Sequence, residues 1–275
     1  MKLPSGASLD FRGPALVMAI VNCNSDSFYA PSRALGDDAV EKALAAGGDG
    51  AAIVDFGAES TRPGAEYISA EEELKRLMPV IKAFRKRSRL PVSVDTRKAV
   101  VARAVLDAGA DIINDISGLG DDPAMPLVCA ERGAAVVLMH KKGVPLTMQE
   151  NPVYENITDE LRLWFKSAVE RAAGAGISQS KIILDPGIGF GKSHENNLEI
   201  LKYLVEIRGK DYPLLIGLSR KSFIGEITGR CEAERLAGTL AANAAAIIGG
   251  AEIIRVHDVK EHVDLAKVLF ALRAA

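Results

Sequence analysis

Cysteine is scarce in this chain and does not cluster. Cys23, Cys129 and Cys231 are far apart, odd in number and without a CxxC spacing. This distribution argues against a disulfide framework and against a zinc site. We therefore expect the protein to work in a reducing cytoplasm.

The sequence also lacks a basic excess and long apolar runs. Lys and Arg number 34 against 36 Asp and Glu, which gives a net charge of -2. Such a chain has no positive field to attract nucleic acid or an anionic membrane. No apolar stretch is long enough to span a bilayer, and none follows Lys2 as a secretory signal requires. We expect neither nucleic acid nor a membrane as a partner.

What the sequence does contain is a recurring short apolar run rich in Val, Ile and Leu. Eight such runs occur, at 16–21, 51–56, 91–94, 111–114, 134–139, 181–184, 213–218 and 252–256. Apolar runs without polar alternation are typical of strands buried on both faces, as in parallel sheets covered by helices. The sequence therefore predicts eight buried parallel strands.

Segments of helical character lie between these runs. They lie at 37–46, 70–86, 98–108, 122–130, 158–175, 195–208, 232–248 and 260–273. Strict alternation of strand and helix, with no strong nucleotide fingerprint, favours a closed (β/α)8 TIM barrel over an open doubly wound sheet. We expect residues 1–275 to form a single domain.

Polar residues follow the predicted strands, at the barrel face where active sites lie. They include Asn22, Asp55, Asp95, Asn114, His140, Asp185, Lys221, Arg255 and His257. Each alone has a structural explanation: Asp95 could cap the next helix, and Arg255 with His257 could form a polar layer with Asp55 or Asp185. Together they favour a ligand site, because burying so many charges without a ligand is costly.

The chemistry of these groups divides into two halves. Four cations form a set suited to a diphosphate: Arg62, Lys221, Arg255 and His257. The amide oxygen of Asn22 is a candidate ligand for Mg2+. Asp95, Asn114 and Asp185 match the donor and acceptor edge of a flat heterocycle such as a pterin or guanine ring. The pattern indicates a heterocycle bound beside a diphosphate.

The glycine-rich sequence DPGIGFGK at 185–192 resembles a phosphate loop but fits neither standard pattern. Proline at 186 breaks the Walker A motif, and lysine at 192 breaks the dinucleotide fingerprint. Two interpretations stay open: a tight loop that lets a ligand approach the backbone beside Phe190, or a structural turn. We expect His140 near the site, and His194 and His262 at helix starts facing solvent.

Seven motifs at the strand ends make the sequence resemble the dihydropteroate synthase family over about 16–268. They are ESTRPG at 59–64, SVDT at 93–96, DIIND at 111–115, VLMH at 137–140, DPGIGFGK at 185–192, GLSRKS at 217–222 and RVHD at 255–258. The resemblance implies condensation of 6-hydroxymethyl-7,8-dihydropterin diphosphate with para-aminobenzoate, giving 7,8-dihydropteroate and diphosphate. It also implies a homodimer and a target of sulfonamides.

The resemblance assigns site residues by matching positions. The pterin site comprises Asp95, Asn114, Met139, Asp185, Gly217 and Lys221. The diphosphate site comprises Asn22, Thr61, Arg62, Arg255 and His257, with Asn22 as the ligand of Mg2+. The para-aminobenzoate site comprises Phe28, Thr61, Phe190, Lys221 and Ser222. The residues implied in catalysis are Asp95, Arg62, Lys221, Arg255 and His257. In this assignment Asp95 offsets positive charge on the pterin methylene, and the cations stabilise the leaving diphosphate.

One segment departs from the family. Its first loop usually reads N-x-T-P-D-S-F-S-D-G-G, whereas residues 22–32 here read NCNSDSFYAPS. Ala30 replaces a carboxylate, and Pro31, after Tyr29, is expected to stiffen the loop, which puts the rate and the handling of para-aminobenzoate in question.

Three alternatives to the synthase stay open from the sequence. They are a pterin-binding paralogue with weak or no synthase activity, a methyltetrahydrofolate-dependent methyltransferase relative, and a non-catalytic subunit of a folate assembly. The basic residues Arg62, Lys221 and Arg255 favour diphosphate chemistry over methyl transfer, because a methyl-transfer site has no diphosphate to hold.

Overall fold

The structure, a computed structural model, describes residues 1–23, 32–60, 67–143, 148, 152–209 and 211–275. Its strands are β1 (Leu16–Asn22), β2 (Ile53–Gly57), β3 (Val92–Asp95), β4 (Ile112–Asp115), β5 (Ala135–Met139), β6 (Ile182–Asp185), β7 (Leu215–Gly217) and β8 (Ile253–Val256). They form an eight-stranded sheet in the order β6-β5-β4-β3-β2-β1-β8-β7. An isolated parallel bridge between Leu184 and Leu214 joins its two ends. The predicted barrel is confirmed.

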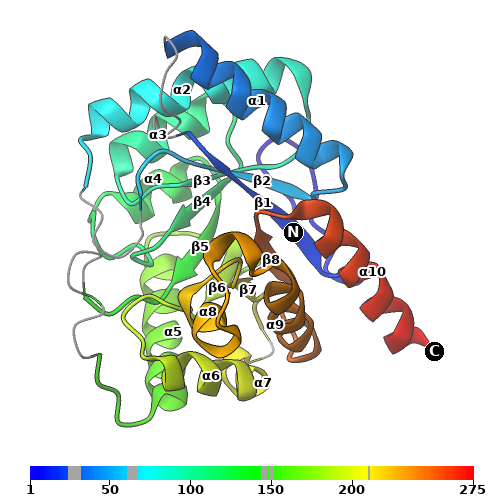
Figure 1. Cartoon of the computed structure of the whole chain (residues 1–275). Helices are drawn as coiled ribbons and strands as arrows, with labels where there is room; N and C mark the ends of the chain where they lie inside the picture. The colour runs from blue at the N-terminus through cyan, green and yellow to red at the C-terminus, as the bar shows by residue number, and fades with distance from the viewer. Residues whose placement is uncertain (24–31, 61–66, 144–147, 149–151, 210) are drawn as a thin grey trace.

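Helices surround the strands on the outside (Figure 1). They are α1 (Ser32–Gly48), α2 (Ala70–Arg87), α3 (Ala99–Asp107), α4 (Met125–Glu131), α5 (Ile157–Gly174), α6 (His194–Lys202), α7 (Leu204–Arg208), α8 (Ser222–Thr228), α9 (Leu236–Ile248) and α10 (Val259–Ala274). The helix predicted over 195–208 is broken at Tyr203, which leaves the helical region with φ −107° and ψ 24°. The helix α8 was not predicted.

The strands present an apolar layer inside the amino end of the barrel. Met18, Ile53, Ile112 and Ile183 form this layer, and Leu3 of the N-terminal segment packs against it. An antiparallel bridge between residues 2 and 8 folds the N-terminal segment under the barrel. The amino end is therefore closed by the chain itself.

Polar residues form the next layer towards the carboxyl ends. Successive side chains of a strand point to opposite faces, so residues two apart share a face. Ile53 is followed on the same face by Asp55, Ile112 by Asn114, and Ile253 by Arg255. The inward face of each strand thus changes from apolar to polar as it nears the mouth of the barrel. Among the described helices, none is both long and apolar enough to cross a membrane.

Candidate active site

A cavity of about 730 Å³ lies at the carboxyl ends of the strands. The predicted site residues that line it are Asn22, Asp95, Asn114, Met139, Asp185, Phe190, Gly217, Lys221, Ser222, Arg255 and His257. Phe28, Thr61 and Arg62 lie outside the described residues, as does the altered part of the first loop. Every predicted site residue that the structure describes therefore reaches one cavity.

Arg255 links two buried carboxylates at the floor of this cavity. Its Nε donates to Asp55 Oδ2 over 2.7 Å, and its Nη2 donates to Asp95 Oδ2 over 3.2 Å. Asn114 Nδ2 donates to the same Asp55 oxygen over 3.2 Å. Of the polar layer considered for Arg255 and His257, the pairing of Arg255 with Asp55 is therefore present, whereas His257 contacts Ser219. Asp55 joins the two predicted halves of the site, a role that the sequence prediction did not give it.

Two buried acceptors in this layer have no hydrogen-bond partner among the described residues. They are Asp55 Oδ1 and Asn114 Oδ1. A buried polar atom without a partner destabilises the fold, so such atoms are rare unless a ligand or water satisfies them. Because Asn114 also lines the cavity, its oxygen is placed to accept a hydrogen bond from a bound molecule.

Burial also perturbs the two carboxyl groups predicted to hold the heterocycle. It raises the pKa of Asp95. The charge of Arg255 opposes this shift, and the charge of Asp55 adds to it. Burial raises the pKa of Asp185 too, although the Gly187 N–H donates to Asp185 Oδ1 over 2.7 Å and Lys221 is nearby. Perturbed pKa values in a cleft are typical of functional sites.

Lys221 lies against the loop that follows β6. Its Nζ donates to the carbonyl of Ile188 and lies 4.4 Å from the centre of the Phe190 ring. Burial lowers the pKa of Lys221 to about 8, and the carboxylate of Asp185 opposes that shift. Lys221 therefore loses its proton at lower pH than an exposed lysine does, while its Nζ lies over the Phe190 ring.

His257 is exposed at the rim of the cavity. Its Nδ1 lies 2.9 Å from Ser219 Oγ, and its backbone N–H donates to the same oxygen over 3.2 Å. These two contacts orient the imidazole at the mouth, beside the strand that carries Arg255.

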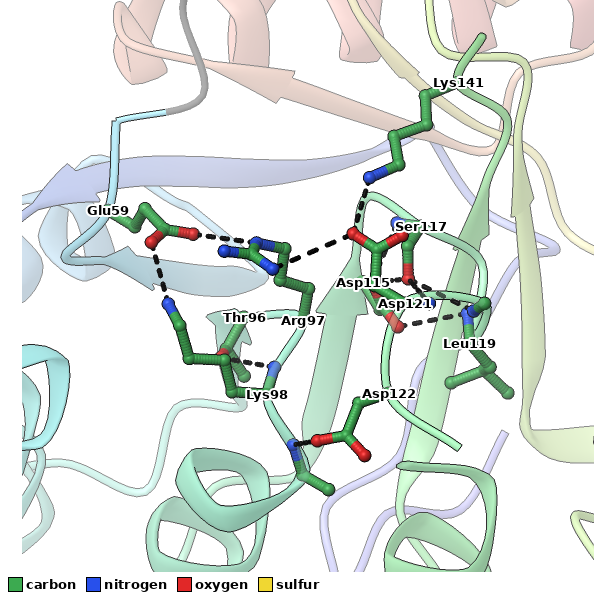
Figure 2. Close-up of polar contacts among 12 residues, drawn as sticks. Glu59, Thr96, Arg97, Lys98, Asp115, Ser117, Leu119, Asp121, Asp122 and Lys141 are labelled. Carbon is green, nitrogen blue, oxygen red and sulfur yellow. Dashed lines mark hydrogen bonds and ion pairs between the residues drawn. The ribbon is translucent and has the colours of Figure 1, made fainter. Parts of the chain in front are cut away.

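Glu59 lies at the cavity edge in a network of charged residues (Figure 2). Its carboxylate accepts from Arg97 Nε over 3.1 Å, from Lys98 Nζ over 2.7 Å and from the Ile68 N–H over 2.8 Å. Glu59 thus connects the residues after β2 with those after β3. The sequence placed Glu59 in a motif but gave no role to it.

The capping interpretation of Asp95 is wrong. The N–H of Ala99, at the start of α3, donates to Asp122 Oδ2 over 2.7 Å (Figure 2). The residue before α3, Lys98, makes no side-chain cap. Asp95 instead faces Arg255 across the cavity, so its position serves the site rather than the helix.

Two glycines of the run after β6 have a structural role in the turn. Gly187 has φ +66°, and a Cβ there would lie 1.9 Å from the His140 carbonyl oxygen. Gly191 has φ +63°, and a Cβ there would lie 2.1 Å from the Lys142 oxygen. These glycines let the loop pack against protein backbone, while Phe190 between them lines the cavity.

The other histidines differ in burial from one another. His194 begins α6 and pairs with Glu226 over 2.7 Å. His262 is fully buried, not exposed as expected from the sequence. Its Nε2 lies 3.0 Å from Asn243 Nδ2, because α9 and α10 pack together there. His140 is buried beside the site, as expected.

The donors at the cavity suit a weakly held Mg2+ better than a caged metal. Among the described residues, no three His, Cys, Asp or Glu side chains cluster as a metal site. Asn22 is exposed at the end of β1 and offers one amide oxygen to the cavity. Mg2+ commonly takes one or two protein ligands and completes its shell with water and substrate phosphates. A single Asn22 ligand fits that pattern, and Mg2+ stays a prediction.

Comparison with known proteins agrees with this geometry. The dihydropteroate synthase of Synechocystis sp. is 44% identical over 273 residues, covering 98% of this chain and 94% of the relative. The Yersinia pestis dihydropteroate synthase, solved as a sulfonamide drug complex, has a TM-score of 0.93 and 40% identity, with 98% of each chain covered. The Xanthomonas albilineans enzyme, solved with 4-aminobenzoic acid, has a TM-score of 0.90 and 39% identity, covering 97% of this chain and 96% of that one.

The family described as pterin binding enzyme matches residues 18–257. That range runs from within β1 to the end of β8 and includes every predicted site residue. The chain therefore belongs to the pterin binding enzymes and, among them, to the dihydropteroate synthases, which are transferases of folate biosynthesis.

Proposed function

We propose that the chain condenses 6-hydroxymethyl-7,8-dihydropterin diphosphate with para-aminobenzoate, giving 7,8-dihydropteroate and diphosphate. The observation that carries this proposal is the polar layer around Arg255, where acceptors for a heterocycle adjoin cations for a diphosphate. The complex of the Xanthomonas relative with 4-aminobenzoic acid supports the second substrate.

The pterin half of the proposal rests on the buried acceptors. Asp95, Asn114 and Asp185 face the amino and ring N–H groups of the pterin, and the partnerless oxygen of Asn114 gains a donor. Lys221 donates to the ring carbonyl. At Gly217 nothing lies within 4 Å of the position of a Cβ. The absence of a side chain there leaves space for the flat ring beside Met139.

The diphosphate half rests on the cations at the rim. Arg255 and His257 hold the diphosphate oxygens, together with Thr61 and Arg62 of the second loop. Asn22 holds Mg2+, which supplies positive charge to the departing diphosphate. Because Asp55 and Asp95 hold Arg255 before the reaction, its charge stabilises the developing negative charge with little reorganisation.

In the reaction the bond between the pterin methylene carbon and the diphosphate oxygen breaks, and its electron pair leaves with the diphosphate. Positive charge develops on the methylene and is shared with the pterin ring. The Asp95 carboxylate lies on the pterin side of the cavity and offsets that charge. The amine nitrogen of para-aminobenzoate then bonds to the methylene and loses a proton to solvent. Phe190 contacts the benzene ring, while Lys221 and Ser222 hold the carboxylate.

A homodimer and a cytoplasmic location are part of the proposal. Ile248, Val268 and Leu272 on α9 and α10 are 64%, 58% and 69% exposed. The contact of Arg273 with the Ile247 carbonyl brings the ends of these helices together. An apolar surface of this kind suits a second copy of the chain. The three unpaired cysteines suit a reducing compartment.

The test is the release of diphosphate when both substrates and Mg2+ are present. The proposal predicts release that requires para-aminobenzoate and is inhibited by a sulfonamide. Tight binding of the pterin diphosphate with no release would overturn it and indicate a non-catalytic pterin-binding protein. Methyl transfer from methyltetrahydrofolate would indicate the methyltransferase alternative.

A further inference from the structure

Lys192 is a buried lysine that the proposed reaction does not use. It is 2% exposed and follows the glycine run after β6. Its Nζ lies 2.9 Å from His140 Nδ1 and donates to the carbonyls of His140 over 3.3 Å and Phe190 over 3.1 Å. Burial lowers the pKa of Lys192 well below its usual value. A buried polar group needs hydrogen-bond partners, and here all three contacts come from two residues at the edge of the active site.

His140 is suited to accept a hydrogen bond from Lys192. Burial lowers the pKa of His140 to about 2, and the charges of Lys192 and Lys142 act in the same direction. The imidazole is therefore neutral, with Nδ1 as the acceptor. Its ring packs edge-on against Trp164 at 5.1 Å between centres. The acceptor is thus fixed in place by the packing of α5 against β5.

Hydrogen bonds hold the backbone of Phe190 on both sides, and Lys192 makes one of them. The Phe190 N–H donates to the Gly187 carbonyl over 3.1 Å, and its carbonyl accepts from Lys192. The neighbouring Ile188 carbonyl accepts from Lys221. The same short loop therefore joins the buried Lys192 to the ring and the carbonyl that Lys221 contacts in the cavity.

We propose that Lys192 is a positioning residue which, through its contact with His140, sets Phe190 and Ile188 against Lys221 and so determines the affinity for the aromatic amine substrate. This inference rests on the proposed function, because it assigns the Phe190 side of the cavity to that substrate. Lys192 acts through the loop and does not touch the reacting atoms. On the pterin side, Asp95 and Asn114 lie on other strands and do not depend on it. Asp185 and Lys221 adjoin the loop, so the pterin is affected less than the aromatic amine.

The test is Lys192→Met, which keeps an unbranched side chain of similar length but removes the donor. We expect the KM for para-aminobenzoate to rise about ten- to a hundredfold, since small displacements of positioning groups have effects of that size. The dissociation constant for the pterin diphosphate rises less, within about threefold, because the contacts of Asp95 and Asn114 on other strands remain. The matched control is Lys202→Met, an exposed lysine of the neighbouring α6, which leaves both constants unchanged.

A double-mutant cycle with Phe190→Leu separates positioning from a general loss of structure. If Lys192 acts through Phe190, the two substitutions are less than additive in KM for para-aminobenzoate; full additivity would overturn the inference. His140→Gln retains an acceptor, so it should raise the KM for para-aminobenzoate less than His140→Leu does. This comparison decides the question if thermal unfolding shows that Lys192→Met does not fold. Equal losses of pterin and para-aminobenzoate affinity would also overturn it. A wild-type protein without diphosphate release would overturn the proposed function instead.

Discussion

The two ends of the barrel each contain a fully buried aspartate paired with an arginine, and they differ in how completely the aspartate is bonded. At the closed end, Asp111 Oδ1 accepts from the Ser5 N–H over 2.9 Å. Its Oδ2 accepts from Arg85 over 2.6 Å and from the Val92 N–H over 3.1 Å. At the mouth, Asp55 Oδ2 accepts from Arg255 and Asn114. The other Asp55 oxygen has no partner in the described part of the chain.

This difference separates an ion pair that holds the fold from one that holds a ligand site. The chain satisfies Asp111 with backbone and side-chain donors, so nothing more is needed there. Around Asp55 and Asn114 it leaves acceptors that only a further donor can satisfy. Both ends contain an Asp–Arg pair. The two pairs differ in the number of hydrogen bonds that the described part of the chain donates to the aspartate.

Among the substitutions that test this comparison, we expect Asp95→Ala to have the largest effect, which is on ligand affinity. Asp95→Ala removes a buried acceptor from the pterin side, and leaving a buried donor without its partner costs about 1–3 kcal/mol for each group. We expect affinity for the pterin diphosphate to fall about a hundredfold or more, as measured by isothermal titration calorimetry. The folded protein should keep its thermal stability, since burial already disfavours the Asp95 charge. Unchanged affinity would refute the pterin assignment.

The matched pair Asp55→Ala and Asp111→Ala tests the comparison itself. Asp111→Ala leaves the partly buried Arg85 without its carboxylate and the Ser5 and Val92 N–H groups without their acceptor. We therefore expect the free energy of unfolding to fall by about 3 to 5 kcal/mol with kcat/KM unchanged. Asp55→Ala displaces Arg255 and should lower kcat/KM about a hundredfold. Its effect on stability is smaller, because the Arg255 side chain is 23% exposed and keeps Asp95. The reverse pattern in urea unfolding and steady-state kinetics would break the comparison.

A smaller effect is expected from pH. The pKa of Lys221 is lowered to about 8 by burial, so its ammonium loses its proton as pH rises through that value. We expect kcat/KM to fall above pH 8, approaching about tenfold per pH unit. Lys221→Arg keeps the charge, so its lower activity should show no such fall. A wild-type profile that is flat from pH 7 to 10 would exclude a role for the Lys221 charge.

The smallest effect is expected in the first loop. Ala30→Asp restores the carboxylate that the family carries at that position, and we expect turnover to rise about two- to tenfold through stabilisation of the cationic methylene. Ala30→Asn is the matched neutral control. Unchanged turnover in both would show that this loop works without the carboxylate.

The barrel was predictable because each strand is buried on both faces. Continuous Val and Ile in runs such as 111–114 and 134–139 allow few other structures, and strand bounds agree within about three residues. The short helix α8 was missed since its seven residues are too few to show a helical period. The break at Tyr203 was missed because residues 195–208 contain no Gly or Pro to mark it.

The site was predictable in its members but not in its contacts. Strand ends of a barrel meet at one face, so Asp95, Asn114 and Arg255 were expected together. The pairing of Arg255 with Asp55 joins residues 200 positions apart. The sequence left it as one of two alternatives, Asp55 or Asp185, and only the packing of the strands decides between them. The burial of His262 and Lys192 likewise depends on neighbouring elements. Sequence gives the residue types of the site, and packing decides which of them remain available to a ligand.

The most direct test of the central claim is a calorimetric titration of the protein with pterin diphosphate and Mg2+. It is repeated with free pterin and then with free diphosphate as competitors. The account predicts that each competitor weakens the apparent affinity for the pterin diphosphate, because the two halves of one cavity hold the two parts of this ligand. It also predicts that Asp111→Ala binds the ligand as the wild type does. Undiminished affinity in the presence of either competitor, or wild-type affinity in Asp95→Ala, would contradict it.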